Sequence, residues 1–242
     1  MIGSVLVPRL LSGVLRTIYP QTCAACDAPA TGVANTGLCE LCMQSCLAIG
    51  IACPRCARPI DGPRAITCAR CSKTRGALRT CTACYEYGGQ LAVALRRLKF
   101  SGRNDIARSL GPLLHERFME VSVTCDVGIA MPLHSSRLAK RGFNQAQRIL
   151  VPLAAHCDLP VLRTVLTRIR PTSPQSRLSR AQRAANLKGA FRATSKVAGK
   201  RILLLDDIRT TGATLGEAAK ALRKAGAREI HGFVVARTEW EG

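Results

Sequence analysis

Residues 201–215 decide the fold, and they read Arg-Ile-Leu-Leu-Leu-Asp-Asp-Ile-Arg-Thr-Thr-Gly-Ala-Thr-Leu. The apolar run from Arg201 to Leu205 predicts a buried strand, and the segment from Leu215 to Lys224 predicts a helix. A further strand is expected from Glu229 to Ala236. Strand, helix and strand at this spacing are typical of a parallel sheet covered by helices.

The turn between this strand and helix carries polar residues in an order that suits a phosphorylated sugar. Asp206 and Asp207 follow the strand at the carboxyl edge of the sheet, where α/β proteins bind ligands. Thr214 and Glu217 form a Thr-x-x-Glu capping box, which alone would indicate only a helix start near Leu215. Here Asp206 and Asp207 precede a segment whose backbone N–H groups and hydroxyls lie at the start of a helix, where proteins bind phosphate. The residues of this segment are Thr210, Thr211, Gly212, Ala213 and Thr214.

The segments upstream of residue 201 complete an α/β domain that we place at 85–242. Helices are expected over 90–99, 106–119 and, as one basic helix, 137–156. A short buried strand over 126–131 leads into Pro132, Leu133 and His134, and 161–169 is β-like. These elements predict a mostly parallel sheet flanked by helices.

The charge of the chain points to an anionic partner. Its 242 residues hold 36 Lys and Arg against 15 Asp and Glu, a net charge of +21, while 47% hydrophobic residues exclude whole-chain disorder. Residues 159–205 contain no acid, and their cations exceed the need of one small phosphorylated ligand: Arg163, Arg168, Arg170, Arg177, Arg180, Arg183, Lys188, Arg192, Lys196, Lys200 and Arg201. The surplus predicts contact with a single-stranded nucleic-acid backbone, and a solvated basic face is the alternative.

Eleven of the thirteen cysteines lie between Cys23 and Cys84, in five C-x-x-C pairs plus Cys46. Two such pairs about a dozen residues apart can hold one tetrahedral zinc ion, so residues 21–80 predict a double zinc ribbon with two structural sites. The odd cysteine count and the absence of an export signal argue against disulfides. The expected ligands are Cys23, Cys26, Cys39 and Cys42, then Cys53, Cys56, Cys68 and Cys71; an alternative register pairs Cys68 and Cys71 with Cys81 and Cys84.

The N-terminal segment 1–20 places Ile2, Leu6, Leu10, Val14 and Ile18 at i, i+4 spacing. This spacing predicts a short amphipathic helix that docks on the protein, with a membrane surface as the alternative. No stretch reaches the roughly 18–20 apolar residues of a membrane-spanning helix. We therefore expect a cytoplasmic protein, with peripheral attachment at the inner face of the membrane as the alternative.

Residues 204–214 resemble the phosphoribosyl pyrophosphate loop of type I phosphoribosyltransferases. Over about residues 20–237 the chain resembles the ComF family, which joins a zinc-ribbon region to such a domain and is associated with DNA uptake in natural competence. The other blocks that carry the resemblance are residues 99–103, Pro132 to His134 with Arg137, residues 141–145, and the spaced positions Gln175, Leu178, Arg183, Asn186 and Phe191.

This resemblance implies a site for phosphoribosyl pyrophosphate, with Mg²⁺ held largely by the substrate's own oxygens. Asp206 and Asp207 would bind the ribose hydroxyls. The 5-phosphate would lie against Arg209, Thr210, Thr211, Gly212, Ala213 and Thr214, and the pyrophosphate against Pro132, Leu133, His134, Arg137, Lys140 and Arg141. Arg209 departs from the aliphatic residue usual there, and its side chain either faces solvent or reaches a phosphate.

The resemblance implies a phosphoribosyltransferase whose acceptor and general base the sequence leaves open. His134 either contacts the leaving group or acts as an acid, or it has a capping or core role. The alternative function is a non-catalytic, ligand-regulated competence factor that binds nucleic acid and uses the same pocket. A third interpretation is that the cysteine module contacts a protein partner of the competence machinery.

Overall fold

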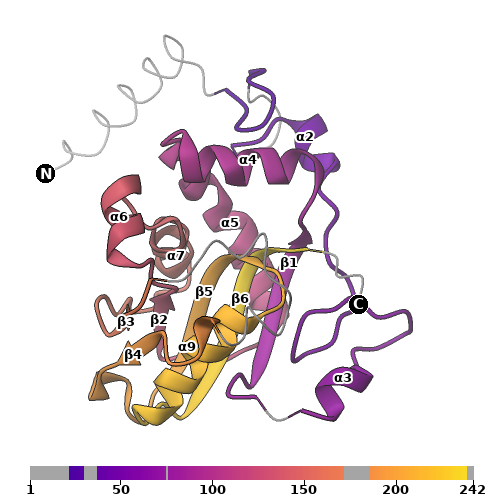
Figure 1. Ribbon diagram of the computed structural model, residues 1–242. Helices are drawn as coiled ribbons and strands as arrows, with labels where there is room; N and C mark the ends of the chain where they lie inside the picture. Colours follow the sequence, from indigo (N-terminus) through magenta and orange to yellow (C-terminus); the bar gives the residue numbers. More distant parts are fainter. Residues whose placement is uncertain (1–21, 30–36, 75, 172–185, 239–242) are drawn as a thin grey trace, which may run out of the picture.

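A four-stranded parallel sheet lies at the centre of the computed structural model, which describes residues 22–29, 37–74, 76–171 and 186–238 (Figure 1). The strand order is β1-β6-β5-β2, and each neighbouring pair is parallel. The strands are β1 (Thr80–Glu86), β2 (Val127–Ala130), β5 (Arg201–Arg209) and β6 (Glu229–Arg237). The predicted α/β class with a parallel sheet is confirmed.

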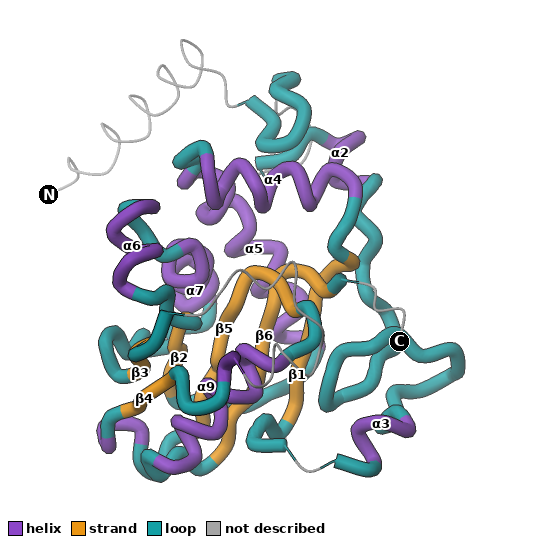
Figure 2. The backbone as a smooth tube through the Cα atoms, in the orientation of Figure 1, coloured by secondary structure: helices purple, strands orange, loops and turns teal. Residues whose placement is uncertain are grey.

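Helices cover both faces of this sheet, which is why β5 and β6 are apolar on both sides. Figure 2 shows α9 (Ala213–Lys224) in front of the strands and α5 (Asn104–Glu120) behind them. The rings of Phe118 on α5 and Phe233 on β6 meet edge to face, with centroids 5.9 Å apart. The other helices of this part are α4 (Gly89–Phe100), α6 (Ser135–Arg141) and α7 (Gln145–His156).

The prediction of one helix over 137–156 is wrong, because the helix ends at Gly142 and a second helix begins at Gln145. Gly142 ends α6 with φ 79°, a left-handed conformation that favours glycine. Asn144 then begins α7, and its side-chain oxygen accepts a hydrogen bond from the Ala146 N–H at 3.0 Å. Because the helix ends at Gly142, α6 and α7 run in different directions. The turn between them lies beside the end of the edge strand β2, where Asn144 donates to the Met131 carbonyl.

Strand β5 extends four residues beyond the predicted end at Leu205, so Asp206 and Asp207 lie inside it and Asp206 pairs with Val234. The predicted capping box is also wrong. Helix α9 begins at Ala213 after Gly212, which has φ 79°. The Glu217 carboxylate instead accepts from the Gly189 N–H and forms an ion pair with Lys220.

Two short strands form a separate antiparallel pair, β3 (Leu166–Arg168) with β4 (Phe191–Ala193). Strand β4 packs against α9, and an isolated bridge joins Arg168 to His134. This pair therefore lies next to the loop that leaves β2. The expected residues Gln175, Leu178 and Arg183 lie outside the described part of the chain, as do Arg177, Arg180 and segment 1–20.

The two cysteine modules repeat one local structure. In each, an antiparallel bridge encloses the first C-x-x-C pair, and the second pair begins a short helix. The first module has the bridge Thr22–Pro29 and the helix α2 (Glu40–Gln44). The second has the bridge Ala52–Pro59 and the helix α3 (Ala69–Ser72). Figure 1 shows α2 beside α4 and α3 beyond the opposite end of β1.

Cys81 and Cys84 are buried residues of the edge strand β1. The chain enters the sheet directly from the second module, since the Arg79 N–H already donates to the Ile230 carbonyl at 2.8 Å. Among the described residues, no helix is long and apolar enough to cross a membrane.

Replacement of Gly111 by Ala tests the close packing of α5 on α7. A Cβ at Gly111 would lie 2.7 Å from the Pro152 Cβ and 3.2 Å from the Pro152 carbonyl carbon, so the helices must shift. We expect Gly111→Ala to lower the free energy of unfolding by about 1–2 kcal/mol in urea titrations. The control is the helical Gly216, whose Cβ would have open space; Gly216→Ala should raise it by up to about 1 kcal/mol. Equal stability of the two variants would contradict this account.

Candidate functional site

Asp206 and Asp207 occupy adjacent positions near the carboxyl end of β5. Asp207 is only 4% exposed, and its Oδ2 lies 2.5 Å from the Lys99 Nζ in an ion pair. Lys99 is in the last turn of α4. The Asp207 N–H donates to the Asp206 Oδ1 at 2.9 Å. The ion pair therefore joins the end of α4 to the predicted site.

The two carboxyl groups differ in their pKa values. Burial raises the pKa of Asp207, but the charge of Lys99 and hydrogen bonds from Lys99 and Gln145 outweigh it and lower that pKa. Burial and the neighbouring Asp207 charge raise the pKa of Asp206 well above its ordinary value. Lys99 therefore favours the charged form of Asp207, whereas burial and the neighbouring carboxylate disfavour the charged form of Asp206.

The segment after α6 forms the wall beside Asp207. Asn144 Nδ2 donates to the Met131 carbonyl at 2.9 Å, which ties this segment to the end of β2. The buried Gln145 accepts from Arg141 Nη1 at 2.6 Å, and the Arg141 guanidinium lies 5.3 Å from the Phe100 ring centre. Each polar residue of the 141–145 block therefore makes a structural contact. Burial lowers the pKa of Arg141, but Arg141 lies close enough to Asp207 that the carboxylate charge acts in the opposite direction and raises it.

The residues expected on the pyrophosphate side follow β2 and extend into α6. Pro132 and Leu133 come directly after Met131. His134 is the N-cap of α6, because its Nδ1 accepts from the Ser136 N–H at 3.3 Å and lies 2.8 Å from the Ser136 Oγ. Arg137 and Lys140 are exposed on α6. His134 therefore caps α6, which was one of the roles predicted for it.

The Arg209 side chain packs against the loop from Thr210 to Thr214, on the side that faces β1. A Cβ at Gly212 would lie 2.4 Å from the Arg209 Nη2, so a larger residue would displace this guanidinium, and the φ of 79° also favours glycine. Arg209 is 9% exposed, and its Nη1 donates to the Cys81 sulfur at 3.2 Å. The reading in which Arg209 faces solvent is thus wrong, because the side chain packs between the loop and β1.

Three residues near the acidic pair were not among the predicted site residues: Lys99, Gln145 and Arg168. Arg168 lies on β3, 5.7 Å from the Phe191 ring centre. Burial and the charge of Arg137 lower the pKa of Arg168, whereas the charge of Asp206 raises it. Lys99 and Gln145 lie in the family-like blocks 99–103 and 141–145, but those blocks carry no role for them, and no local motif marks Arg168. Only the tertiary structure brings these cations to the carboxylates.

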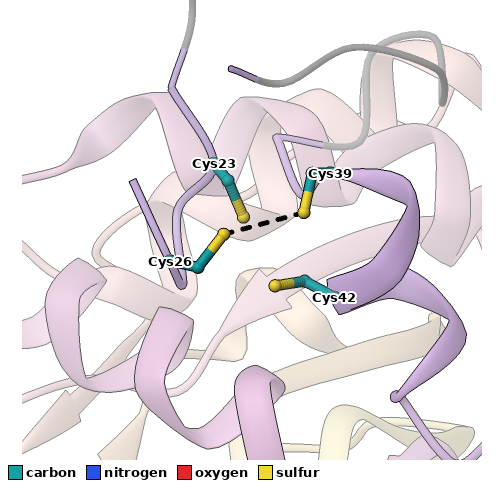
Figure 3. Close-up of side chains that lie close together, drawn as sticks. All are labelled: Cys23, Cys26, Cys39 and Cys42. Atoms are coloured by element: carbon teal, nitrogen blue, oxygen red, sulfur yellow. Dashed lines mark hydrogen bonds between the residues drawn. The ribbon is translucent and has the colours of Figure 1, made fainter. Parts of the chain in front are cut away.

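Both predicted sets of four cysteines come together, as Figure 3 shows for Cys23, Cys26, Cys39 and Cys42. Within each set all sulfur atoms lie within 4.8 Å of one another. The sulfurs of Cys26 and Cys39 are 3.7 Å apart, and those of the second set's Cys56 and Cys68 are 3.8 Å apart. A tetrahedron with bonds of about 2.3 Å has edges of about 3.8 Å, so the geometry fits zinc. The alternative register with Cys81 and Cys84 is wrong.

Backbone donors also favour thiolates in these clusters. The Ala25 N–H donates to the Cys23 sulfur, and the Cys68 N–H donates to the Cys53 sulfur, both at 3.4 Å. Burial raises the pKa of Cys23, but several such hydrogen bonds outweigh it and lower that pKa to about 6. Thiolate is the form that binds metal ions.

The first cluster is attached to the helix that carries Lys99. Arg97 on α4 binds both carboxylate oxygens of Asp27, at 2.6 and 2.8 Å, and also reaches the Ala24 carbonyl. Arg103 donates to the Thr22 carbonyl at 3.0 Å. The first module therefore holds the end of α4 from which Lys99 reaches Asp207.

The fold and this site define a protein with a phosphoribosyltransferase domain, and residues 138–239 match the family model described as "Phosphoribosyl transferase domain". The chain is 30% identical to DNA utilization protein YhgH of Salmonella typhi over 90% of this chain and 98% of the relative. It is 32% identical to competence protein F of Haemophilus influenzae over 85% and 92%. The chain belongs to the ComF family of competence and DNA utilization proteins, as its sequence predicts.

Solved structures similar to parts of the chain include an amidotransferase and a phosphoribosyltransferase. Glutamine phosphoribosylpyrophosphate amidotransferase from B. subtilis is 23% identical, with a TM-score of 0.37 over 53% of this chain and 25% of that one. A phosphoribosyltransferase from Corynebacterium diphtheriae is 22% identical, with a TM-score of 0.34 over 59% and 67%.

Replacement of Asp206 by Asn should stabilise the protein at neutral pH. The raised pKa of Asp206 means that the folded state keeps a proton that the unfolded state loses above about pH 3.9. The free energy of unfolding of wild type therefore falls as the pH rises from about 3.9 to the raised pKa of Asp206 in the folded state. Asp206→Asn removes that loss. We expect a higher free energy of unfolding than wild type at pH 7 and no gain at about pH 3.5, measured by urea titration.

The matched control for this test is the exposed Asp61, for which Asp61→Asn should show no such pH-dependent difference. A gain of equal size at both pH values for Asp206→Asn, or a loss at pH 7, would refute the described pairing of the two carboxyl groups.

Proposed function

We propose that the protein binds phosphoribosyl pyrophosphate with Mg²⁺ at the carboxyl end of β5 and acts as a phosphoribosyltransferase. The observation that carries this proposal is the juxtaposition of Asp206 and Asp207 with the loop from Thr210 to Thr214 at the start of α9. The carboxylates accept hydrogen bonds from ribose hydroxyls. The loop and the positive end of the α9 dipole favour the 5-phosphate.

The electrostatics of the site support a ligand that brings its own donors and cation. Lys99 balances Asp207, while the second charge of the pair is unfavourable without a ligand. Mg²⁺, bound chiefly through the substrate's oxygens, would neutralise the pyrophosphate. On the pyrophosphate side, Arg137, Lys140 and Arg141 would stabilise the negative charge that grows as the bond to the ribose C1 breaks.

A link to DNA handling is the second part of the proposal. It rests on the names of the relatives, DNA utilization protein and competence protein F. In the described part of the acid-free stretch, exposed cations suited to a nucleic-acid backbone are Arg163, Lys188, Arg192 and Lys196. Arg201 instead pairs with Asp126 at 2.6 Å. In the alternative function the same pocket regulates nucleic-acid binding without turnover.

Calorimetric titration with Mg²⁺ and phosphoribosyl pyrophosphate tests the site. We expect Asp206→Asn and Asp207→Asn each to weaken binding at least about tenfold, because each loses a charged acceptor for a ribose hydroxyl. Asp61→Asn, an exposed acid in the second module, should bind as wild type does. Undiminished binding by both site variants would refute the assignment of this pocket.

Pyrophosphate release then separates the two functions. Wild type is assayed with a panel of nucleobases and single-stranded oligonucleotides as acceptors. Release with any acceptor, abolished in Asp206→Asn, is the result expected for a transferase. Binding without release across the panel would instead support the regulatory alternative.

We further propose that both cysteine clusters hold structural zinc, which would stabilise modules with small cores. Cys39→Ser and Cys68→Ser should each lower the zinc content from two ions per chain to one, measured by metal analysis of the purified protein. Cys46→Ser is the control, since the Cys46 thiol donates to the Cys42 carbonyl and lies outside both clusters. Retention of two ions in Cys39→Ser would contradict this ligand set.

A further inference from the structure

A cavity of about 280 Å³ lies between the second cysteine module and the phosphate loop. Its wall on the module side includes Arg55 and Arg70. On the other side it includes Arg209, Gly212 and Ala213, together with Lys220 of α9. The loop to which we assign the 5-phosphate therefore shares a cavity with cations from a part of the chain about 150 residues away in sequence.

Arg55 is held in place by the second cysteine module. It lies between the ligands Cys53 and Cys56, and its Nη1 donates to the carbonyls of Cys71 and Thr74 at 2.5 and 2.6 Å. These bonds fix the plane of the guanidinium, while Nη2 makes no hydrogen bond to the described residues. A planar cation held in this way loses little conformational entropy when an anion binds.

Arg209 forms the floor of the cavity and lacks an acidic partner. More than nine-tenths of its surface is buried, and its hydrogen bond to the Cys81 sulfur supplies no carboxylate. No acid of the described residues forms an ion pair with Arg209. A buried cation without a counter-charge is unfavourable. The nearby Glu217 is already paired with Lys220 at 2.5 Å, so the cavity keeps an excess of positive charge.

We infer that this cavity receives the phosphate of a phosphorylated ribose, and that Arg55 of the second cysteine module donates to it together with the phosphate loop. The inference rests on the proposed function and extends it. The metal module contributes a binding residue to the site, in addition to its own folding. Because the cysteine ligands flank Arg55, metal binding and sugar phosphate binding strengthen each other.

The test uses the full-length, zinc-loaded protein and calorimetric titration with ribose 5-phosphate and, separately, with pyrophosphate. Arg55→Gln should weaken ribose 5-phosphate binding about tenfold, the effect of losing one charged hydrogen bond, and should leave pyrophosphate binding within about twofold. Arg64→Gln is the matched control, an exposed arginine of the same module outside the cavity lining, and should bind both as wild type does.

A second variant covers the case in which Arg55→Gln disturbs the cysteine cluster. Arg70→Gln changes another cavity arginine without removing the hydrogen bonds from Arg55 to the Cys71 and Thr74 carbonyls, and should weaken ribose 5-phosphate binding about threefold by loss of charge. Zinc is measured in every sample. If Arg55→Gln loses zinc, the decision rests on Arg70→Gln. A selective loss of ribose 5-phosphate affinity relative to pyrophosphate affinity in that variant supports the inference, and no selective loss overturns it.

The possible results separate this inference from the proposed function. If wild type binds neither phosphoribosyl pyrophosphate nor ribose 5-phosphate, both are overturned. If wild type binds and the two arginine variants bind equally well, only the role of the cysteine module is overturned. Equal weakening for ribose 5-phosphate and pyrophosphate would overturn the assignment of the cavity to the sugar phosphate.

Discussion

The buried ion pair between Lys99 and Asp207 is the contact on which the arrangement of the site depends. Asp207 is buried on β5 and would be costly there as an isolated carboxylate, so the end of α4 must deliver its lysine accurately. The first cysteine module holds α4 through the contacts of Arg97 with Asp27 and Ala24. A metal ion in that module would thus support the position of Lys99 from a distance.

The second module reaches the same loop by another route. It leads directly into β1, where Cys81 accepts a hydrogen bond from Arg209, and Arg209 in turn fills the space beneath Gly212. Both cysteine modules are therefore connected to β5, one through α4 and one through β1. The two modules thus contact the α/β domain at different places, the first at the end of α4 and the second at the start of β1.

Much of this could be predicted from local patterns, and the errors share one cause. Apolar runs identified β2, β5 and β6, and the cysteine spacing identified both clusters, because strand burial and metal chelation depend on near neighbours. The single helix over 137–156 was wrong because its apolar and basic pattern continues across Gly142, while the backbone there is left-handed. The end of β5 was wrong because pairing with β6 extends a strand through two acids that local propensity would place in a loop.

The sequence by itself determined the α/β class, the first cysteine set and the order of acids, threonines and glycine around the start of α9, and it left two registers open for the second cysteine set. These features lie in short segments, where the spacing along the chain sets the spacing in space. Only the tertiary structure decided that Lys99 balances Asp207, that Arg209 is buried beside Gly212, and that Arg55 shares a cavity with the start of α9. Each of these contacts joins residues from distant segments, and their charges are compatible with burial only once the sheet has brought the partners together.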